Sequence, residues 1–123
     1  MNKNKAPQPT ATATLSLKVT PEPVGNRRSL LLEAADLVDG DRNAQYGDPI
    51  GDFRCTADMW AAYIRRKTGI PANFALDPHD VAAMMAMLKL SRIGWSAQKR
   101  DSWADLAGYA ACGFDCAERE HAQ

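Results

Sequence analysis

Several features are missing from this chain of 123 residues, and each absence argues against one functional class of protein. Fifteen basic and fifteen acidic residues give a formal net charge of zero, so overall charge provides neither a general grip on nucleic acid nor attraction to an anionic membrane. No apolar run approaches the roughly 18 to 20 residues that span a bilayer, and the first residues lack the apolar core of a signal peptide. We therefore expect a cytoplasmic protein whose partner is neither a membrane nor nucleic acid.

Thiol and imidazole groups are also few. The three cysteines, Cys55, Cys112 and Cys116, lack CxxC spacing, and only His79 and His121 accompany them. This composition predicts reduced thiols rather than a zinc site or a disulfide framework. A glycine-rich phosphate loop and an HExxH sequence are both absent, and His79 falls in a predicted first helical turn. These absences argue against metalloprotease chemistry and against a nucleophile paired with a histidine base.

Residues 1–25 differ in composition from the rest. They are rich in Ala, Thr, Pro and Lys, and a continuous helix is excluded by Pro7, Pro9, Pro21 and Pro23. We predict a flexible N-terminal arm. Within it, residues 14–20 alternate apolar and polar positions, the pattern of a short half-buried strand that would need a partner from another subunit or from the domain edge.

From residue 26 onward the pattern is helical. The first predicted helix begins at Asn26 or Ser29 and ends at Gly40, and a polar connection over residues 41–48 follows it. Asp48 before Pro49 starts a second helix that closes near Gly69.

The sequence Asp77-Pro-His-Asp80 starts a third helix in the same way. This helix is apolar around most of its circumference, so we predict that it is the most buried. The fourth begins at Asp101 or Ser102 and runs to about Arg119. The fold class is all-α, a compact bundle of about four helices over residues 26–119, with a tail of residues 120–123.

The fourth helix carries a stripe of functional interest. Asp101, Asp105 and Tyr109 follow one another at four-residue spacing, so they share one side of the helix. Lys89 and Arg92 share a face near the end of the third helix, and the short connection makes the two helices antiparallel neighbours. Facing charges at a surface contribute only about 0 to 1 kcal/mol, so stability gives little reason for such a cluster. The alternative for each residue is an N-cap, a solvated helix end or ordinary packing.

The connection over residues 41–48 is a second candidate. Arg42 can contact a phosphate and Tyr46 a ring, although polar turns of this composition are common. The predicted ligand-binding residues are Arg42, Tyr46, Lys89, Arg92, Arg100, Asp101, Asp105 and Tyr109. The candidate ligands for Mg²⁺ are Asp101, Asp105, Glu33 and Asp36, the last two also being explained by a solvated helix face.

The chain from about Leu30 to Phe114 resembles a family of small uncharacterised proteins common in bacteriophages and prophages. The matching sequences are Leu32-Glu-Ala-Ala35, Asp41-Arg-x-x-x-Tyr-Gly-Asp-Pro49, Asp77-Pro-x-Asp-Val-Ala-x-Met-Met85, Leu88-Lys-Leu-Ser-Arg92 and Arg100-Asp-Ser-Trp-x-Asp-Leu-Ala-Gly-Tyr109. More distantly, the layout is similar to nucleotide-modification-associated domains of phages and to MazG-like nucleoside triphosphate pyrophosphohydrolases. Those enzymes hold magnesium with ExxE and ExxD acids on facing helices, whereas this chain has no ExxE and its fourth-helix acids are four apart.

Three functional hypotheses remain open. The first is a protein that binds or sequesters a phosphorylated nucleotide or nucleotide signal in the bacterial host, and the second is a magnesium-dependent pyrophosphohydrolase of the MazG-like kind. The third is an oligomeric interaction module without a small ligand. Because a core of this size is marginal alone, we expect a homo-oligomer in every case.

Overall fold

In a computed structural model, the described part of the chain, residues 25–122, is helical throughout except for short connections, and it contains no strand. The side chains of Asp41 and Arg42 are outside this description. The predicted arm and the predicted strand at 14–20 lie outside the described residues. The all-α prediction is confirmed for the remainder.

The long helices begin and end where capping residues predict. Helix α4 (Pro49–Thr68) follows Asp48, whose carboxylate accepts a hydrogen bond from the Ile50 N–H, and it ends at Gly69, which has a φ of 72°. Helix α5 (Pro78–Trp95) begins with a capping box in which the Asp77 N–H donates to Asp80 Oδ2 at 2.8 Å. Helix α2 spans Gly25–Asp39 and helix α6 spans Arg100–Ala122.

Two local predictions need correction. The connection predicted over residues 41–48 contains a short helix, α3 (Asp41–Tyr46), which ends at Gly47 with a φ of 83°. None of its six residues breaks a helix, and a segment this short has no apolar periodicity to reveal it. The predicted tail is also helical up to Ala122, because Glu120 of this last turn contacts His79 on α5.

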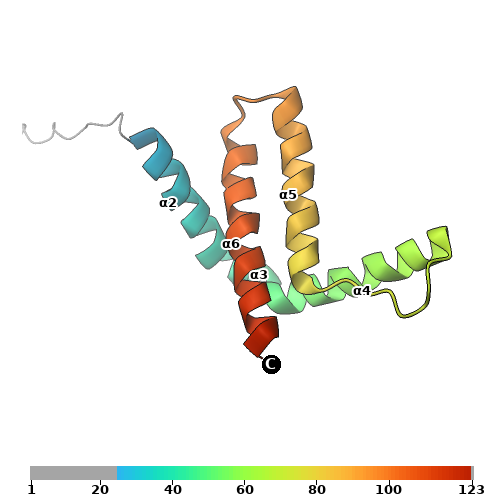
Figure 1. Cartoon of the computed structure of the whole chain (residues 1–123). Helices are drawn as coiled ribbons and strands as arrows, with labels where there is room; N and C mark the ends of the chain where they lie inside the picture. The colour runs from blue at the N-terminus through green and yellow to red at the C-terminus, as the bar shows by residue number, and fades with distance from the viewer. Residues whose placement is uncertain (1–24, 123) are drawn as a thin grey trace, which may run out of the picture.

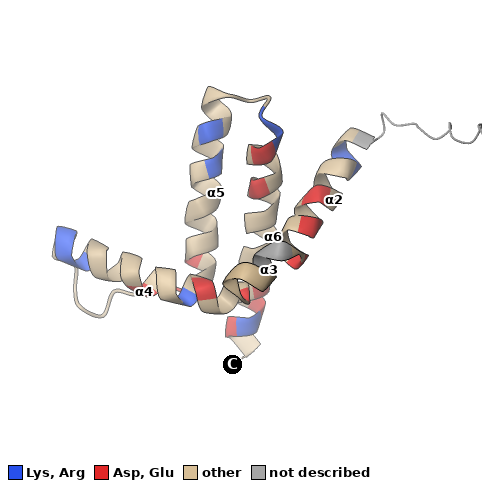
Figure 2. Ribbon diagram, turned by 180° about the vertical axis from the view of Figure 1, so that it is seen from behind, with Lys and Arg blue, Asp and Glu red and all other residues tan. Residues whose placement is uncertain are grey.

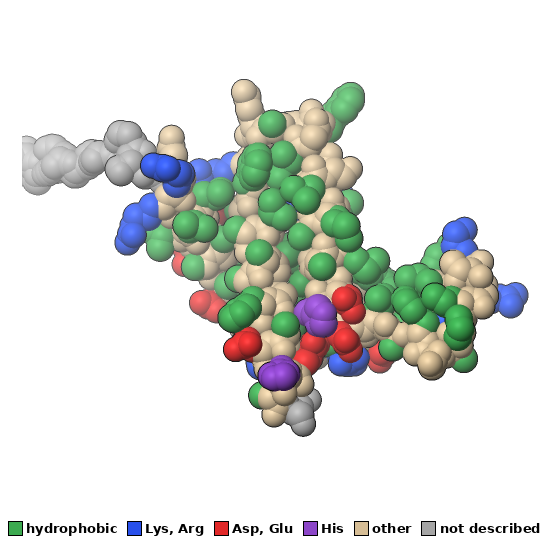
Figure 3. Space-filling model, viewed as in Figure 1, with side chains coloured by type: hydrophobic (Ala, Val, Ile, Leu, Met, Phe, Trp, Pro, Cys, Tyr) green, Lys and Arg blue, Asp and Glu red, His purple; other side chains and the backbone are tan. Residues whose placement is uncertain are grey.

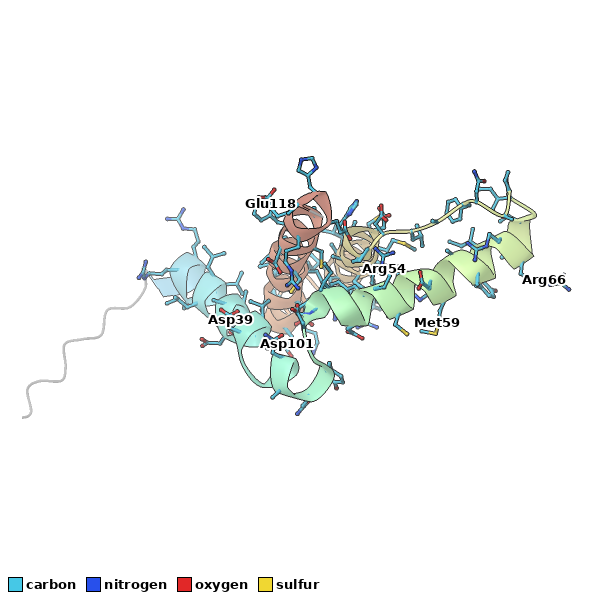
Figure 4. All side chains as sticks on the ribbon, turned by 90° about the horizontal axis from the view of Figure 1, so that it is seen from below. Asp39, Arg54, Met59, Arg66, Asp101 and Glu118 are labelled. Carbon is cyan, nitrogen blue, oxygen red and sulfur yellow. The ribbon has the colours of Figure 1, made fainter. Side chains whose placement is uncertain are left out.

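Helices α5 and α6 form an antiparallel hairpin, and α2 packs against α6 (Figure 1). Helix α4 crosses the base of the hairpin and continues beyond α5, where Figure 4 shows Met59 and Arg66. Among the described helices, α6 contacts α2, α4 and α5, whereas α5 contacts α4 and α6. Helix α6 is therefore the central one. The prediction that α5 is the most buried helix is not contradicted, because α5 has four buried residues among 18 and α6 has four among 23, although one apolar side of α5 faces solvent.

The core consists mainly of small side chains that allow close helix contacts. Ala57, Ala104 and Cys116 are fully buried, and an added Cβ on Gly113 would lie 3.0 Å from the Ala82 Cβ. This close contact fixes the separation of α5 and α6 and thereby positions the side chains that both helices carry. Among the described helices, none is long and apolar enough to cross a membrane.

Candidate functional site

The back of the hairpin, the side seen in Figure 2, shows Lys or Arg segments on α5 and Asp or Glu segments on α6. One ion pair joins these two helices: Lys89 Nζ on α5 lies 2.9 Å from Asp105 Oδ2 on α6, and the two side chains are only 13% and 26% exposed. The prediction that Lys89 faces the acidic stripe of the fourth helix is confirmed. Partial burial strengthens this pair relative to one on the open surface.

Around this pair lies an open hollow of about 580 Å³, which we call the basic groove. Arg92 and Lys99 line it together with Lys89, and Asp101 and Asp105 provide its acidic side. Trp95, which is 93% exposed, also lines it. Three cations against two carboxylates give the groove an excess of positive charge, which suits an anionic group.

A second hollow, of about 120 Å³, adjoins the groove and is called here the aromatic pocket. Tyr46 of α3, Phe53 of α4 and Tyr109 of α6 line it. The rings of Phe53 and Tyr109 lie 6.4 Å apart between centroids and are tilted by 33°. Asp105 lines both hollows, so the Lys89–Asp105 pair lies at the boundary between the aromatic pocket and the basic groove.

An ion-pair cluster holds α4 against α6 near the aromatic pocket. Arg119 donates to both carboxylate oxygens of Asp48, at 2.9 and 2.7 Å, and to Asp115 at 3.1 Å. The Arg119 guanidinium lowers the pKa of the Asp48 carboxyl. Because Asp48 starts α4, this clamp helps to position Phe53 opposite Tyr109. Sequence reasoning treated Asp48 only as a helix cap and missed this clamp, since no local spacing links residues 71 apart.

Of the predicted ligand-binding residues, Arg100 lies apart from these hollows, and the side chain of Arg42 is outside the described residues. Arg100 donates from Nε to Glu33 Oε1 at 2.6 Å and from Nη2 to Ser29 Oγ at 3.1 Å, which ties the start of α6 to α2. Arg42 itself belongs to α3. The other six predicted residues line one or both hollows. The structure adds Phe53, Asp52, Trp95 and Lys99 to the set.

The predicted magnesium ligands are not gathered. Within the described residues, no three of Asp101, Asp105, Glu33 and Asp36 bring ligand atoms within 4.8 Å of one another. Glu33 is engaged by Arg100, and Asp36 is exposed on α2.

A different group comes close together at the start of α5, formed by Asp77, His79 and Asp80. Its polar atoms already have structural partners, because the two acids form the capping box and His79 Nδ1 lies 2.7 Å from Glu120 Oε1. The hydrogen bond to Glu120 raises the pKa of His79. This group therefore ties the first turn of α5 to the last turn of α6.

Comparison with known proteins finds relatives without an assigned activity. The model of a domain of unknown function, DUF6378, matches residues 29–117. The Gene 55 protein of Mycobacterium phage D29 is 34% identical over 84 residues, which cover 68% of this chain and 50% of that protein. The Gene 55 protein of Mycobacterium phage L5 is 35% identical over 82 residues, 67% of this chain and 48% of that protein. The chain thus spans about half the length of these relatives, and no solved structure matches it.

Proposed function

This chain belongs to the DUF6378 family, a domain of unknown function, and is similar to Gene 55 proteins of two bacteriophages, and we propose that it binds a phosphorylated nucleotide. The observation that carries the proposal is the meeting of the aromatic pocket and the basic groove at the Lys89–Asp105 pair. A nucleotide has the same two parts, a flat ring and a charged phosphate chain. The relatives add no ligand, so the proposal rests on this geometry.

The ring is assigned to the aromatic pocket. Tyr46 and Tyr109 offer faces for stacking and hydroxyl groups for hydrogen bonds to a base or sugar. Ligand sites usually enclose about 300 to 1,000 Å³, so a pocket of 120 Å³ holds only part of a ligand. The adjoining groove of 580 Å³ provides room for the remainder.

The phosphates are assigned to the basic groove. The Arg92 guanidinium offers a planar fork of donors that matches phosphate oxygens, and Lys89 and Lys99 offer compact positive charges. Lys89 would then exchange its contact with Asp105 for one with the phosphate, or share itself between the two. A phosphate contact of this kind is charge-assisted and contributes about 1.5 to 3 kcal/mol.

Binding without turnover is favoured over a MazG-like pyrophosphohydrolase. Catalysis through magnesium needs several carboxylates that converge on the ion. Asp101, Asp105, Glu33 and Asp36 do not converge in this way, whereas a binding protein needs only the cations and rings. Sequestration of a host nucleotide or of a nucleotide signal fits such a site.

The first experiment identifies the ligand. The purified protein is denatured and the released small molecules are examined by mass spectrometry. Calorimetry with a panel of nucleoside mono-, di- and triphosphates then measures affinity with and without Mg²⁺. A nucleotide that is retained, or that binds in the panel, supports the proposal, and the absence of both contradicts it.

Two variants test the assignment of the site. Lys89→Met should weaken nucleotide binding about 10- to 100-fold, the equivalent of one charge-assisted hydrogen bond. Lys67→Met, which removes an exposed lysine from the last turn of α4, is the matched control and should leave affinity unchanged. Equal affinities for the two variants would exclude the basic groove as the site.

Asp105→Asn separates binding from hydrolysis. For a binding protein, removing this carboxylate frees Lys89 and removes repulsion from the phosphates, so affinity should be kept or increased. For a magnesium-dependent enzyme, the same change removes a ligand and should abolish release of pyrophosphate. Wild-type protein that converts a triphosphate to monophosphate and pyrophosphate would replace the binding proposal with the enzymatic one.

A further inference from the structure

The front of the α5–α6 hairpin, the side seen in Figure 3, is covered by hydrophobic side chains that no described element packs against. It lies opposite the proposed nucleotide site, which is on the back. Large apolar surfaces that remain exposed on a small domain mark sites of association. The question is which partner this surface fits.

On α5, Ala83, Met87, Leu90 and Gly94 are all exposed, and at about 100° per residue they lie on a different side of the helix from Lys89, which contacts α6; we assign them to the front. Their spacings of four, three and four residues place them in one stripe along the helix, as in a helix that packs against another helix. Met87 is 59% and Leu90 52% exposed. Along the helix the order of sizes is small, large, large, small.

On α6 the front carries Trp103, Ala107, Ala110 and Phe114 with the same spacings. Phe114 is 68% exposed and Trp103 40%. Here the order of sizes is the reverse, large, small, small, large. The two stripes lie side by side because α5 and α6 are antiparallel neighbours.

We propose that this front face joins two copies of the chain into a dimer, in which α5 of one copy packs against α6 of the other. A two-fold dimer brings the same patch together from both copies, so its surface must complement itself. The two stripes meet that condition. The large end residues of the α6 stripe, Trp103 and Phe114, lie opposite the small end residues of the α5 stripe. The large central residues of α5, Met87 and Leu90, lie opposite the small central residues of α6. Because both orders of size are symmetric, this match holds for parallel and for antiparallel helices.

The charge of the face fits the same partner, and its size limits the affinity. The eight positions of the two stripes include no charged residue, and the chain has no net charge, so two copies do not repel each other. Each stripe spans 12 residues, about 18 Å at 1.5 Å per residue. Two helices of about 10 Å diameter then give roughly 360 Å² in projection. This is smaller than the roughly 800 Å² that each partner buries in a typical stable interface, so we expect a dimer of modest affinity.

The resulting assembly is a four-helix bundle made of two hairpins, a common way for antiparallel helix pairs to bury an apolar layer. Acidic and histidine side chains gather at the lower end of the face in Figure 3 and form a polar rim. Both nucleotide sites stay open on the outside. This inference therefore stands or falls separately from the proposed function.

The test measures the mass of the full chain in solution by light scattering or sedimentation. Protein concentrations of about 1 to 100 µM are used, because dissociation constants of weak interfaces lie in this range. We expect twice the chain mass of 13.4 kDa. Met87→Glu should convert the dimer to a monomer, with at least about a 100-fold rise in the dissociation constant, because it buries an unpaired charge. Met59→Glu is the matched control, since Met59 is also 59% exposed but lies on α4 beyond α5, and it should remain dimeric.

A size exchange tests which helices meet. Ala107→Leu should weaken the dimer by filling the small middle of α6, and adding Leu90→Ala on the facing α5 should restore it. Circular dichroism checks that every variant stays folded. A wild-type monomer at the highest concentration overturns the proposal and assigns the face to another partner. A dimer that survives Met87→Glu, or that only Met59→Glu breaks, overturns it as well.

Discussion

The two sides of the α5–α6 hairpin differ although the same two helices form both. The back carries the Lys89–Asp105 pair and adjoins the Tyr109 ring, whereas the two stripes of the front carry no charged residue. Tyr109 and Ala110 are neighbours in the chain, yet they belong to opposite sides. On these two helices, the side of the helix on which a residue lies therefore predicts whether its substitution affects nucleotide binding or dimerisation, and its closeness in sequence to another residue does not.

The largest expected effect comes from placing a charge at Ala110, on the front of the hairpin. Ala110→Arg places a charge in the front face and should raise the dimer dissociation constant at least about 100-fold, because an unpaired charge is costly to bury. Nucleotide affinity, measured by calorimetry, should change less than about twofold. The back of the hairpin is untouched by this variant.

Tyr109→Leu makes the reverse test. It removes ring stacking but keeps apolar bulk in the aromatic pocket, so nucleotide affinity should fall about 10-fold. Association, measured by sedimentation, should stay as in the wild type. If either variant changes both properties equally, the two sides are coupled and the comparison fails.

The next effect concerns the close contact that holds the two helices in register. Gly113→Ala brings a Cβ to 3.0 Å from the Ala82 Cβ and should lower the free energy of unfolding by about 1 to 2 kcal/mol in urea denaturation. Gly51→Ala in α4 is the control, because nothing lies within 4 Å of its added Cβ. It should raise the free energy of unfolding by up to about 1 kcal/mol through helix propensity. Equal changes in the free energy of unfolding for the two variants would mean that α5 and α6 move apart to accept the added methyl group at no cost.

A smaller effect comes from His79. The hydrogen bond to Glu120 raises the pKa of His79 above its usual value of 6.5 in the folded protein. A raised folded pKa stabilises the protein fully below pH 6.5 and loses that stabilisation as the pH rises through the raised value. The free energy of unfolding should therefore fall from pH 6 toward pH 8 by an amount that His79→Gln removes. His121→Gln, at the exposed end of α6, should leave the fall unchanged.

The smallest effect concerns the thiols. Burial raises the pKa of the Cys116 thiol to about 11, so iodoacetamide should modify it only after unfolding, whereas the exposed Cys55 should react in the native protein. Peptide mass spectrometry distinguishes the two. Because Cys55 lines neither hollow and belongs to neither front stripe, its alkylation should alter neither nucleotide affinity nor dimerisation. A change in nucleotide affinity or in dimerisation after alkylation of Cys55 would show that this part of α4 contributes to the property that changed.

The fold was predictable wherever local chemistry determines it. Asp48-Pro49 and Asp77-Pro78 start α4 and α5, and Gly69 ends α4, because caps and backbone preferences act within a few residues. Helix α3 was missed because six residues are too few for periodicity. The last turn of α6 was missed because a partner on α5, His79, lies 41 residues away from Glu120.

The candidate site was partly predictable for the same reason. Lys89 and Asp105 lie on adjacent antiparallel helices joined by a short connection, so their contact follows from helical spacing. Three features instead depend on how α2 and α4 pack against α6: the contribution of Phe53, the Asp48–Arg119 clamp, and the absence of a metal-ligand group among the described acids of α2 and α6.

The sequence by itself determined that the described chain forms capped helices and that α5 and α6 pair with Lys89 toward Asp105, since both depend on contacts close in the chain. Only the tertiary structure decided that α6 rather than α5 is central, and that one side of their hairpin stays uncovered. An apolar helix surface shows that something must cover it. Which helix does so depends on packing between distant segments, and here no described helix covers it.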